Sequence, residues 1–214
     1  VVIVVAVVVS KDHNDSSSST TTTCLGAIPI KQGQTAISSW INPVTGSGEL
    51  QFSSPCTSYY EVPIPNAWFV LIGTGDGYSV STCSRDLNFD SALSVGTGSI
   101  GLCDNLQCIA YANSTFDWCT ESSYGAATVL FRTDVGIPYY IGVEASNNPS
   151  QGNFTLSISK VVAPVNSDCS NAIVIKPGES LITGTFTNAT YDVHFNYPCE
   201  WTDGLPSVWY SLIG

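Results

Sequence analysis

Basic side chains are scarce in this chain. It contains six Lys and Arg against 17 Asp and Glu, which gives a formal net charge of −11. Nucleic acids and anionic lipid surfaces are bound mainly through clustered basic side chains. The composition therefore excludes a nucleic-acid partner and a basic membrane-binding patch.

Histidine and the familiar catalytic motifs are scarce as well. The two histidines, His13 and His194, are too few for the paired Cys/His knuckles of a zinc site. The G-x-S-x-G, H-E-x-x-H, phosphate-loop and dinucleotide patterns do not occur in the sequence. The aspartates that a glycosidase could use stand in turn-like contexts, where capping is their usual role: Asp76, Asp86, Asp90, Asp104, Asp117 and Asp134. We therefore predict no catalytic residue, no metal site and no enzyme activity.

Helical periodicity and long apolar runs are missing too. No window carries the sustained i, i+3, i+4, i+7 pattern of an amphipathic helix. The longest apolar run has nine residues, and a membrane-spanning helix needs about 20, so we expect no membrane span. Methionine is absent, including an initiator, which indicates a processed or partial chain.

Short runs typical of β-strands recur instead. FTLSISK alternates apolar and hydroxyl residues from Phe154, and YYIGVEA puts Tyr139, Ile141 and Val143 on one face. AWFVLIG, residues 67–73, is continuously apolar and suits a central strand. Clusters of Gly, Asn and Pro separate these runs. The pattern predicts an all-β protein, an antiparallel β-sandwich of jelly-roll type.

Cysteines and glycosylation signals are plentiful. The even number of cysteines and the lack of a tight C-x-x-C favour disulfides over metal ligation, and hence an oxidising, extracellular or cell-surface location. The cysteines are Cys24, Cys56, Cys83, Cys103, Cys108, Cys119, Cys169 and Cys199. N-linked glycans are predicted at Asn14, Asn113, Asn153 and Asn188, and O-linked glycans on the tract Ser16–Thr23. No other cofactor is expected.

An internal repeat organises the chain. CLGAIPIKQGQT from Cys24 and CSNAIVIKPGES from Cys169 share the pattern C-x-x-A-I-x-I-K-x-G. A second cysteine follows after 32 residues in the first copy and after 30 in the second, and each copy then reaches an aromatic strand, AWFVLIG or VWYSLIG. We therefore predict a complete sandwich domain over residues 24–161 and an incomplete second copy over residues 162–214.

The repeat also suggests disulfide pairings. Its matched cysteines favour the bridges Cys24–Cys56 and Cys169–Cys199. The four remaining cysteines lie within the first copy and allow three connectivities. Of these we prefer Cys83–Cys103 with Cys108–Cys119.

Several stretches of the first copy resemble one known family. These are CLGAIPIKQGQT, NAWFVLIGTGDGYSVSTCS, FDSALSVGTGS, LQCIAYANS and GIPYYIGVEASNNPSQGNFTLSIS. Together they resemble the pre-peptidase C-terminal type of β-sandwich module, which occurs in tandem in secreted proteins. The resemblance implies a sandwich of eight or nine strands without catalytic residues, acting in binding or spacing. Many relatives carry acidic residues after LQCIA that could hold calcium, whereas Tyr111-Ala-Asn-Ser-Thr is neutral here and does not favour a calcium site.

The first nine residues need a separate explanation. They are all valine except for Ile3 and Ala6: Val1, Val2, Ile3, Val4, Val5, Ala6, Val7, Val8 and Val9. A signal peptide would have a basic start and a cleavage site, which are missing. Valine and isoleucine favour strands, and a strand that is apolar on both faces must be covered on both. Residues 1–10 thus resemble a pilus-type donor strand, with residues 11–23 as its linker, although they could also be the last strand of a preceding module.

Three classes of function follow from these features. The first is a non-catalytic structural subunit of an extracellular filament, whose partners are copies of itself joined head to tail by strand addition. The second is a secreted module from a longer tandem-repeat protein, an adhesin or enzyme appendage, that binds glycans or protein, with Tyr59, Tyr60 and Trp118 as candidate contacts. An enzyme is the least favoured class. Polymers on sedimentation would indicate the first class, and a monomer retained on polysaccharide would indicate the second.

Overall fold

Regular structure in this chain consists of β-strands joined by turns. The computed structural model describes residues 24–31, 33–41, 66–99, 106–114, 119–146, 151–178, 182–190 and 207–213. These residues contain eleven strands and two short 3-10 turns, and no α-helix occurs among them. No helix in this described part is long and apolar enough to cross a membrane. The all-β prediction is therefore confirmed.

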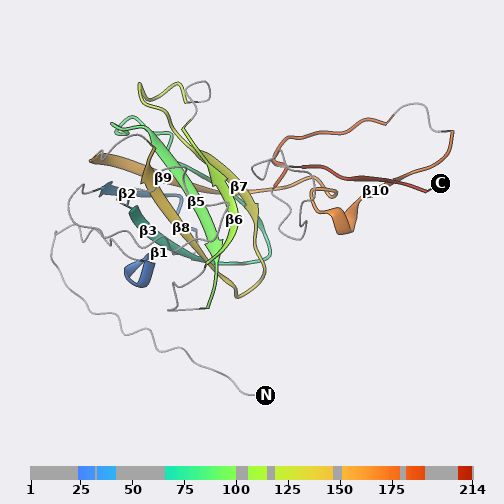
Figure 1. Ribbon diagram of the computed structural model, residues 1–214, viewed down its shortest axis with the longest axis horizontal. Coiled ribbons are helices and arrows are strands. Elements are labelled where there is room, and N and C mark those ends of the chain that lie inside the picture. The colour runs from blue at the N-terminus through green and yellow to red at the C-terminus, as the bar shows by residue number, and fades with distance from the viewer. Residues whose placement is uncertain are drawn as a thin grey trace, which may run out of the picture.

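Nine strands form two sheets that face each other (Figure 1). The five-stranded sheet contains, in spatial order, β1 (Ile28–Pro29), β3 (Asn66–Ile72), β8 (Pro138–Ala145), β5 (Ser91–Thr97) and β6 (Gln107–Ala112). The four-stranded sheet contains β2 (Ala36–Ile41), β9 (Gly152–Val161), β4 (Gly77–Ser81) and β7 (Thr128–Arg132). All neighbours are antiparallel except β1 and β3, which are parallel. The sandwich prediction is confirmed.

The hydrophobic core lies between the two sheets. Phe69 of the five-stranded sheet meets Phe154 of the four-stranded sheet edge to face, with ring centroids 6.2 Å apart. Phe131 and Tyr139 make a second contact between the sheets, at 5.7 Å. Offset and edge-to-face ring pairs of this kind contribute roughly 0.5–1.5 kcal/mol beyond their buried area. Aromatic contacts therefore join the two layers.

The sequence patterns explain which faces are buried. In β9, Phe154, Leu156 and Ile158 are buried, and the threonine and serine residues between them are only partly covered. In β8, by contrast, every residue is buried. Tyr139 points into the main core, and its neighbour Tyr140 packs in a separate apolar cluster with Trp68 and Leu106. A strand in the middle of this sheet is thus covered on both faces.

The preferred disulfide pairing within the first copy is wrong. Cys83 is bonded to Cys119, with their Cα atoms 5.5 Å apart, so neither Cys83–Cys103 nor Cys108–Cys119 forms. Cys83 follows β4 and Cys119 precedes β7, and these strands pair with Ser81 opposite Thr128. Sheet register therefore brings together cysteines that are 36 residues apart in the chain. Closing such a loop stabilises the fold by roughly 2–4 kcal/mol.

Other cysteines are only partly described. Cys24 and Cys108 are also disulfide-bonded, and both belong to the apolar cluster around Trp68. Cys56, Cys103 and Cys199 lie outside the described residues. The Cys24–Cys56 and Cys169–Cys199 bridges therefore stay predictions.

A small sheet follows the sandwich. After a 3-10 turn at Cys169–Asn171, β10 (Ile173–Ile175) pairs with β11 (Tyr210–Leu212) in parallel. This pair belongs to neither layer of the sandwich and lies beside it, with β11 in red (Figure 1). The partial second copy expected from the sequence therefore forms strands of its own.

Candidate functional site

The β10–β11 pair has the same local structure as the start of the first copy. The first copy also begins with a 3-10 turn, at Cys24–Gly26, followed by a short strand that pairs in parallel with an aromatic strand. Ile28 lies opposite Phe69, and the residues equivalent to them in the repeat, Ile173 and Tyr210, lie opposite each other. The sequence repeat is thus a structural repeat with the same strand register.

Turn geometry supports the same equivalence. Each copy has the same hydrogen bond from the alanine of the repeat pattern to the first cysteine of that pattern. The Ala27 N–H donates to the Cys24 carbonyl, and the Ala172 N–H donates to the Cys169 carbonyl, both at 3.1 Å. Gly33 and Gly178 have φ values of 80° and 92°, a region that non-glycine residues rarely adopt. The two copies therefore begin with the same turn, strand and left-handed glycine.

The two copies differ sharply in burial. Leu71 of β3 is 5% exposed, whereas its equivalent Leu212 of β11 is 71% exposed. Phe69 is fully buried, and its equivalent Tyr210 is only half-buried. In β10, Val174 is 47% exposed. An apolar surface that β3 of the first copy places in the core is therefore exposed on β11, beside the partly exposed β10.

The cause is the number of neighbouring strands. β3 pairs with β1 on one edge and with β8 on the other, and its core face meets the second sheet. Within the described part of the chain, β11 pairs only with β10. We call the far edge of β11 the open edge.

Backbone groups of two residues point to this open edge. The Ile173 N–H donates to the Trp209 carbonyl at 3.1 Å, so Trp209 uses its carbonyl on the β10 side. Successive residues of a strand direct their hydrogen-bonding groups to alternate edges. The N–H and C=O groups of Tyr210 and Leu212 therefore face away from β10. Unpaired groups on an apolar edge form a template for another strand.

The small sheet is held firmly to the segment that joins it to the sandwich. The side-chain amide of Asn166 donates to the Trp209 carbonyl at 2.9 Å, and the Trp209 N–H donates to the Asn166 carbonyl at 2.8 Å. Ala189 and Thr190 are buried, and a Cβ on Gly77 of β4 would lie 3.6 Å from the Thr190 methyl group. These contacts place the small sheet next to the end of the four-stranded sheet.

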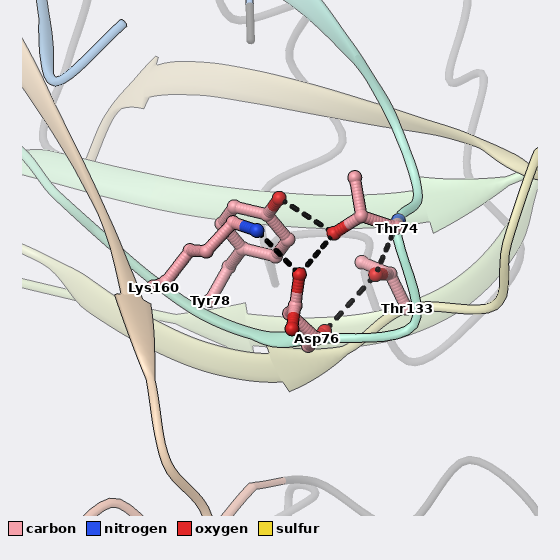
Figure 2. A network of polar contacts seen from close by, with 5 residues as sticks. All are labelled: Thr74, Asp76, Tyr78, Thr133 and Lys160. Atoms are coloured by element: carbon pink, nitrogen blue, oxygen red, sulfur yellow. Dashed lines mark hydrogen bonds and ion pairs between the residues drawn. The ribbon is translucent and has the colours of Figure 1, made fainter. Parts of the chain in front are cut away.

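A polar network lies at the same end of the sandwich (Figure 2). The Thr74 hydroxyl donates to the Asp76 carboxylate at 2.5 Å and bonds the Tyr78 hydroxyl at 2.9 Å. The Lys160 ammonium forms an ion pair with the Asp76 carboxylate at 2.6 Å. This hydrogen bond from Lys160, together with the one from Thr74, lowers the pKa of Asp76 below its ordinary value. The groups bond one another across the β3–β4 turn and β9, which suits a structural role.

A buried carboxyl group lies in the five-stranded sheet. Glu144 of β8 is buried, and the Ser94 hydroxyl of the neighbouring β5 donates to its carboxylate at 2.9 Å. Burial raises the pKa of Glu144 to about 7, and the Ser94 hydrogen bond opposes that rise. We did not expect this group from the sequence, although a glutamate within the apolar run YYIGVEA was a signal.

Several predicted site residues cannot be located. Val1–Val9, Asn14, the Ser16–Thr23 tract, and the candidate contacts Tyr59, Tyr60 and Trp118 lie outside the described residues. The three described sequon asparagines, Asn113, Asn153 and Asn188, are all exposed. The glycan and ligand assignments stay predictions.

The described aspartates stand at hydrogen-bonded or turn positions. The Asp90 carboxylate accepts a hydrogen bond from the Gly125 N–H at 2.7 Å, and Asp86 accepts one from the Thr155 hydroxyl at 2.9 Å. Asp134 precedes the turn at Gly136, whose φ is 80°. Asp104 and Asp117 lie outside the described residues. In the described part of the chain, no group of three or more His, Cys, Asp or Glu could hold a metal ion.

Comparison with known proteins gives a weak structural likeness. No protein-family model matches this chain, and no curated protein matches it. A solved structure, described as CorA, a surface-associated copper-binding protein important in copper acquisition by Methylomicrobium album BG8, is similar with a TM-score of 0.42 and 8% identity. The similarity covers 64% of this chain and 99% of CorA. A likeness this low carries no inference about function, and no family model supports the resemblance to pre-peptidase C-terminal modules.

Proposed function

We propose that this chain is a non-catalytic structural subunit of an extracellular filament, assembled head to tail by β-strand addition. The observation that carries the proposal is the open edge of β11. The equivalent strand of the first copy, β3, has a neighbour on each side, whereas β11 has one neighbour among the described residues. The exposed Leu212 and Val174 belong to the same small sheet. The surface is thus apolar, and its backbone groups have no strand partner in the part of the chain that the structure describes.

The N-terminal run supplies a matching strand. Val1–Val9 is apolar at every position, so in any strand that it forms both faces need cover. Addition of a strand to an open sheet edge gives main-chain hydrogen bonds and buries alternate side chains on each face. Each valine-sized side chain removed from water contributes roughly 1.5–3 kcal/mol before the costs of association.

Geometry favours a filament over a closed pair. The run and the open edge belong to different segments of the chain, residues 1–9 and residues 210–212. A contact between two different surfaces repeats from one subunit to the next, and it forms a fibre when the rotation does not close a ring.

An oxidising environment is consistent with this role. The Cys83–Cys119 bridge favours a location outside the cytoplasm, where disulfides persist. The exposed asparagines at Asn113, Asn153 and Asn188 would be accessible to glycosylation. A disulfide-bonded, glycosylated sandwich is suited to a surface appendage, and its strands need supply no catalytic group.

Deletion of residues 1–10 tests the proposal. We expect the full chain to sediment and image as polymers, and the deleted chain to remain monomeric with the same thermal unfolding temperature. Val135→Lys is a matched control, because Val135 is an exposed apolar residue on a turn of the first copy and belongs to neither β10 nor β11. Polymers that form equally well without residues 1–10 would contradict the proposal.

The same preparation tests the alternative of a binding module. A full chain that stays monomeric and is retained on a polysaccharide, with retention lost in Trp118→Ala, would favour that function instead.

A further inference from the structure

We propose that Val1–Val9 of a second copy pairs antiparallel with β11, in the position that β8 occupies beside β3, with Ala6 opposite Trp209. This inference rests on the proposed filament function and names the surface and register of its contact. It rests on two observations. The pairs β1–β3 and β10–β11 have the same register, and β3 has a second neighbour, β8, where β11 has none among the described residues.

The equivalence of the copies fixes the direction of pairing. β3 uses one edge for its parallel neighbour β1 and the other for its antiparallel neighbour β8. β11 uses the equivalent first edge for β10. Its open edge therefore has the geometry that β3 presents to β8, and an incoming strand there is antiparallel.

The position beside β3 requires an unusual strand. β8 is buried at all of its eight residues, because the second sheet covers one face and an apolar cluster containing Tyr140 and Trp68 lies on the other. A strand such as β9, which alternates apolar and polar residues, would bury hydroxyl groups at such a position. Val1–Val9 is apolar at every position, as suits a strand position that is covered on both faces in the first copy.

Two residues that differ from valine specify the register. Opposite Trp68, β8 carries its smallest residue, Gly142, and opposite Leu71 it carries the large Tyr139. Trp209 and Leu212 are the repeat equivalents of Trp68 and Leu71. If an incoming strand pairs with β11 as β8 pairs with β3, the residue opposite Leu212 comes three positions before the residue opposite Trp209. Ala6 and Ile3 have that spacing.

In this register the smallest and the largest side chains of the run match β8. Ala6 takes the place of Gly142 and Ile3 takes the place of Tyr139. A uniform valine strand would leave the register undefined, because a shift by one residue would exchange two equally apolar faces. The single alanine beside a tryptophan therefore gives the strand one preferred position.

The register predicts individual residue pairs. Val5 and Ile3 would exchange backbone hydrogen bonds with Tyr210 and Leu212, whose N–H and C=O groups face the open edge. Val4 would lie opposite Ser211 in a non-hydrogen-bonded pair, where Cα atoms are about 4.5 Å apart. That separation permits a disulfide between cysteines at the two positions.

The test is a cross-link between two different chains. Full-length Val4→Cys protein is mixed with full-length Ser211→Cys protein, assembled and oxidised, and the linked peptides are identified by mass spectrometry. We expect a Val4→Cys to Ser211→Cys link and its loss when Val5→Cys replaces Val4→Cys, because Val5 faces the opposite side of the strand. Thermal unfolding of each variant shows that the sandwich is folded.

The outcomes separate this inference from the proposed function. Polymers in which Val4→Cys links to another position, or not at all, would overturn the register while filament assembly stands. A link within one chain of the double variant V4C/S211C at high dilution would make the chain its own partner and overturn the second copy. Absence of polymers in the unmodified chain would overturn both proposals.

Discussion

The strands β3 and β11 have matching sequences and matching first neighbours but opposite surroundings. β3 lies between β1 and β8 and contributes Phe69 and Leu71 to the core. β11 lies beside β10, and its Leu212 is exposed. Burial is therefore set by the strands that surround a segment as much as by the segment itself. The same apolar sequence stabilises the fold in one copy and presents a contact surface in the other.

The second copy also has its own partial covering. A Cβ added at Gly184 would collide with the hydroxyl of Tyr210, so Gly184 lies against the side chain of this β11 residue. Leu212 and Ile213 extend beyond this contact and are exposed. On β11 itself the exposed apolar side chains thus lie towards the C-terminal end of the strand.

The largest difference in stability is expected between alanine substitutions of the two equivalent leucines, Leu71 and Leu212. Leu71→Ala removes a buried side chain from the core and should lower the free energy of unfolding by roughly 2–5 kcal/mol. Leu212→Ala removes an exposed side chain and should change it by less than about 0.5 kcal/mol. Chemical denaturation of the two variants measures the difference, with the unmodified chain as the reference.

Polymer formation, unlike stability, should depend on the exposed Leu212. We expect Leu212→Ala to weaken polymer formation while the sandwich stays fully folded, as judged by sedimentation at equal protein concentration. If the two leucine variants lose equal stability, the exposed position of Leu212 is wrong.

A second prediction concerns the pH dependence of the first copy. The pKa of Glu144 is about 7 in the folded chain, against an ordinary value of 4.5. Between these values the folded state binds more protons than the unfolded state, so stability falls as pH rises. The difference corresponds to about 3 kcal/mol lost by pH 8. Glu144→Gln should abolish most of this fall, because the amide stays neutral and can still accept the Ser94 hydrogen bond.

Urea denaturation at pH 5 and pH 8 measures this effect. The unmodified chain should be less stable at pH 8, and Glu144→Gln should unfold at similar urea concentrations at both values. In the proposed register Val8 replaces Glu144 beside β11, so the assembled second copy should contribute no such pH dependence. Equal pH dependence in both proteins would show that Glu144 is not the cause.

The sequence predicted the strands well where side-chain alternation was strong. Phe154, Leu156 and Ile158 were assigned to one face, and all three are buried in the core. The repeat identified the correspondence of Ile28 with Ile173, and the two strands have the same register. Local patterns were sufficient here because each depends on neighbouring residues alone.

Other features depend on which strands become neighbours. The Cys83–Cys119 bridge follows from the pairing of β4 with β7, whereas the preferred pairings joined cysteines that are close in sequence. Glu144 stands in an apolar strand, but its burial depends on what covers that face of the sheet. The exposure of Leu212 likewise depends on a strand that the described chain does not supply. Single-strand patterns contain none of this information.

The smallest expected effect concerns the polar network beside the junction of the two copies. Lys160 and Asp76 are each about half exposed, at 54% and 44% of their side-chain surfaces, so solvent weakens their attraction. The hydrogen bond from Lys160 is the main cause of the lowered pKa of Asp76. Lys160→Gln should therefore raise that pKa towards its ordinary value and leave the unfolding temperature nearly unchanged.

The sign of the pH effect distinguishes this ion pair from Glu144. A carboxyl group with a lowered pKa stabilises the folded state above its unfolded pKa, and this contribution is lost as the pH falls through the folded value. An NMR titration of the Asp76 carboxyl carbon in the unmodified chain and in Lys160→Gln measures the change, with Arg132→Gln as a control on a neighbouring strand. An unchanged Asp76 pKa in Lys160→Gln would contradict the ion pair. A large loss of stability would mean that the network anchors the junction between the copies more strongly than its exposure indicates.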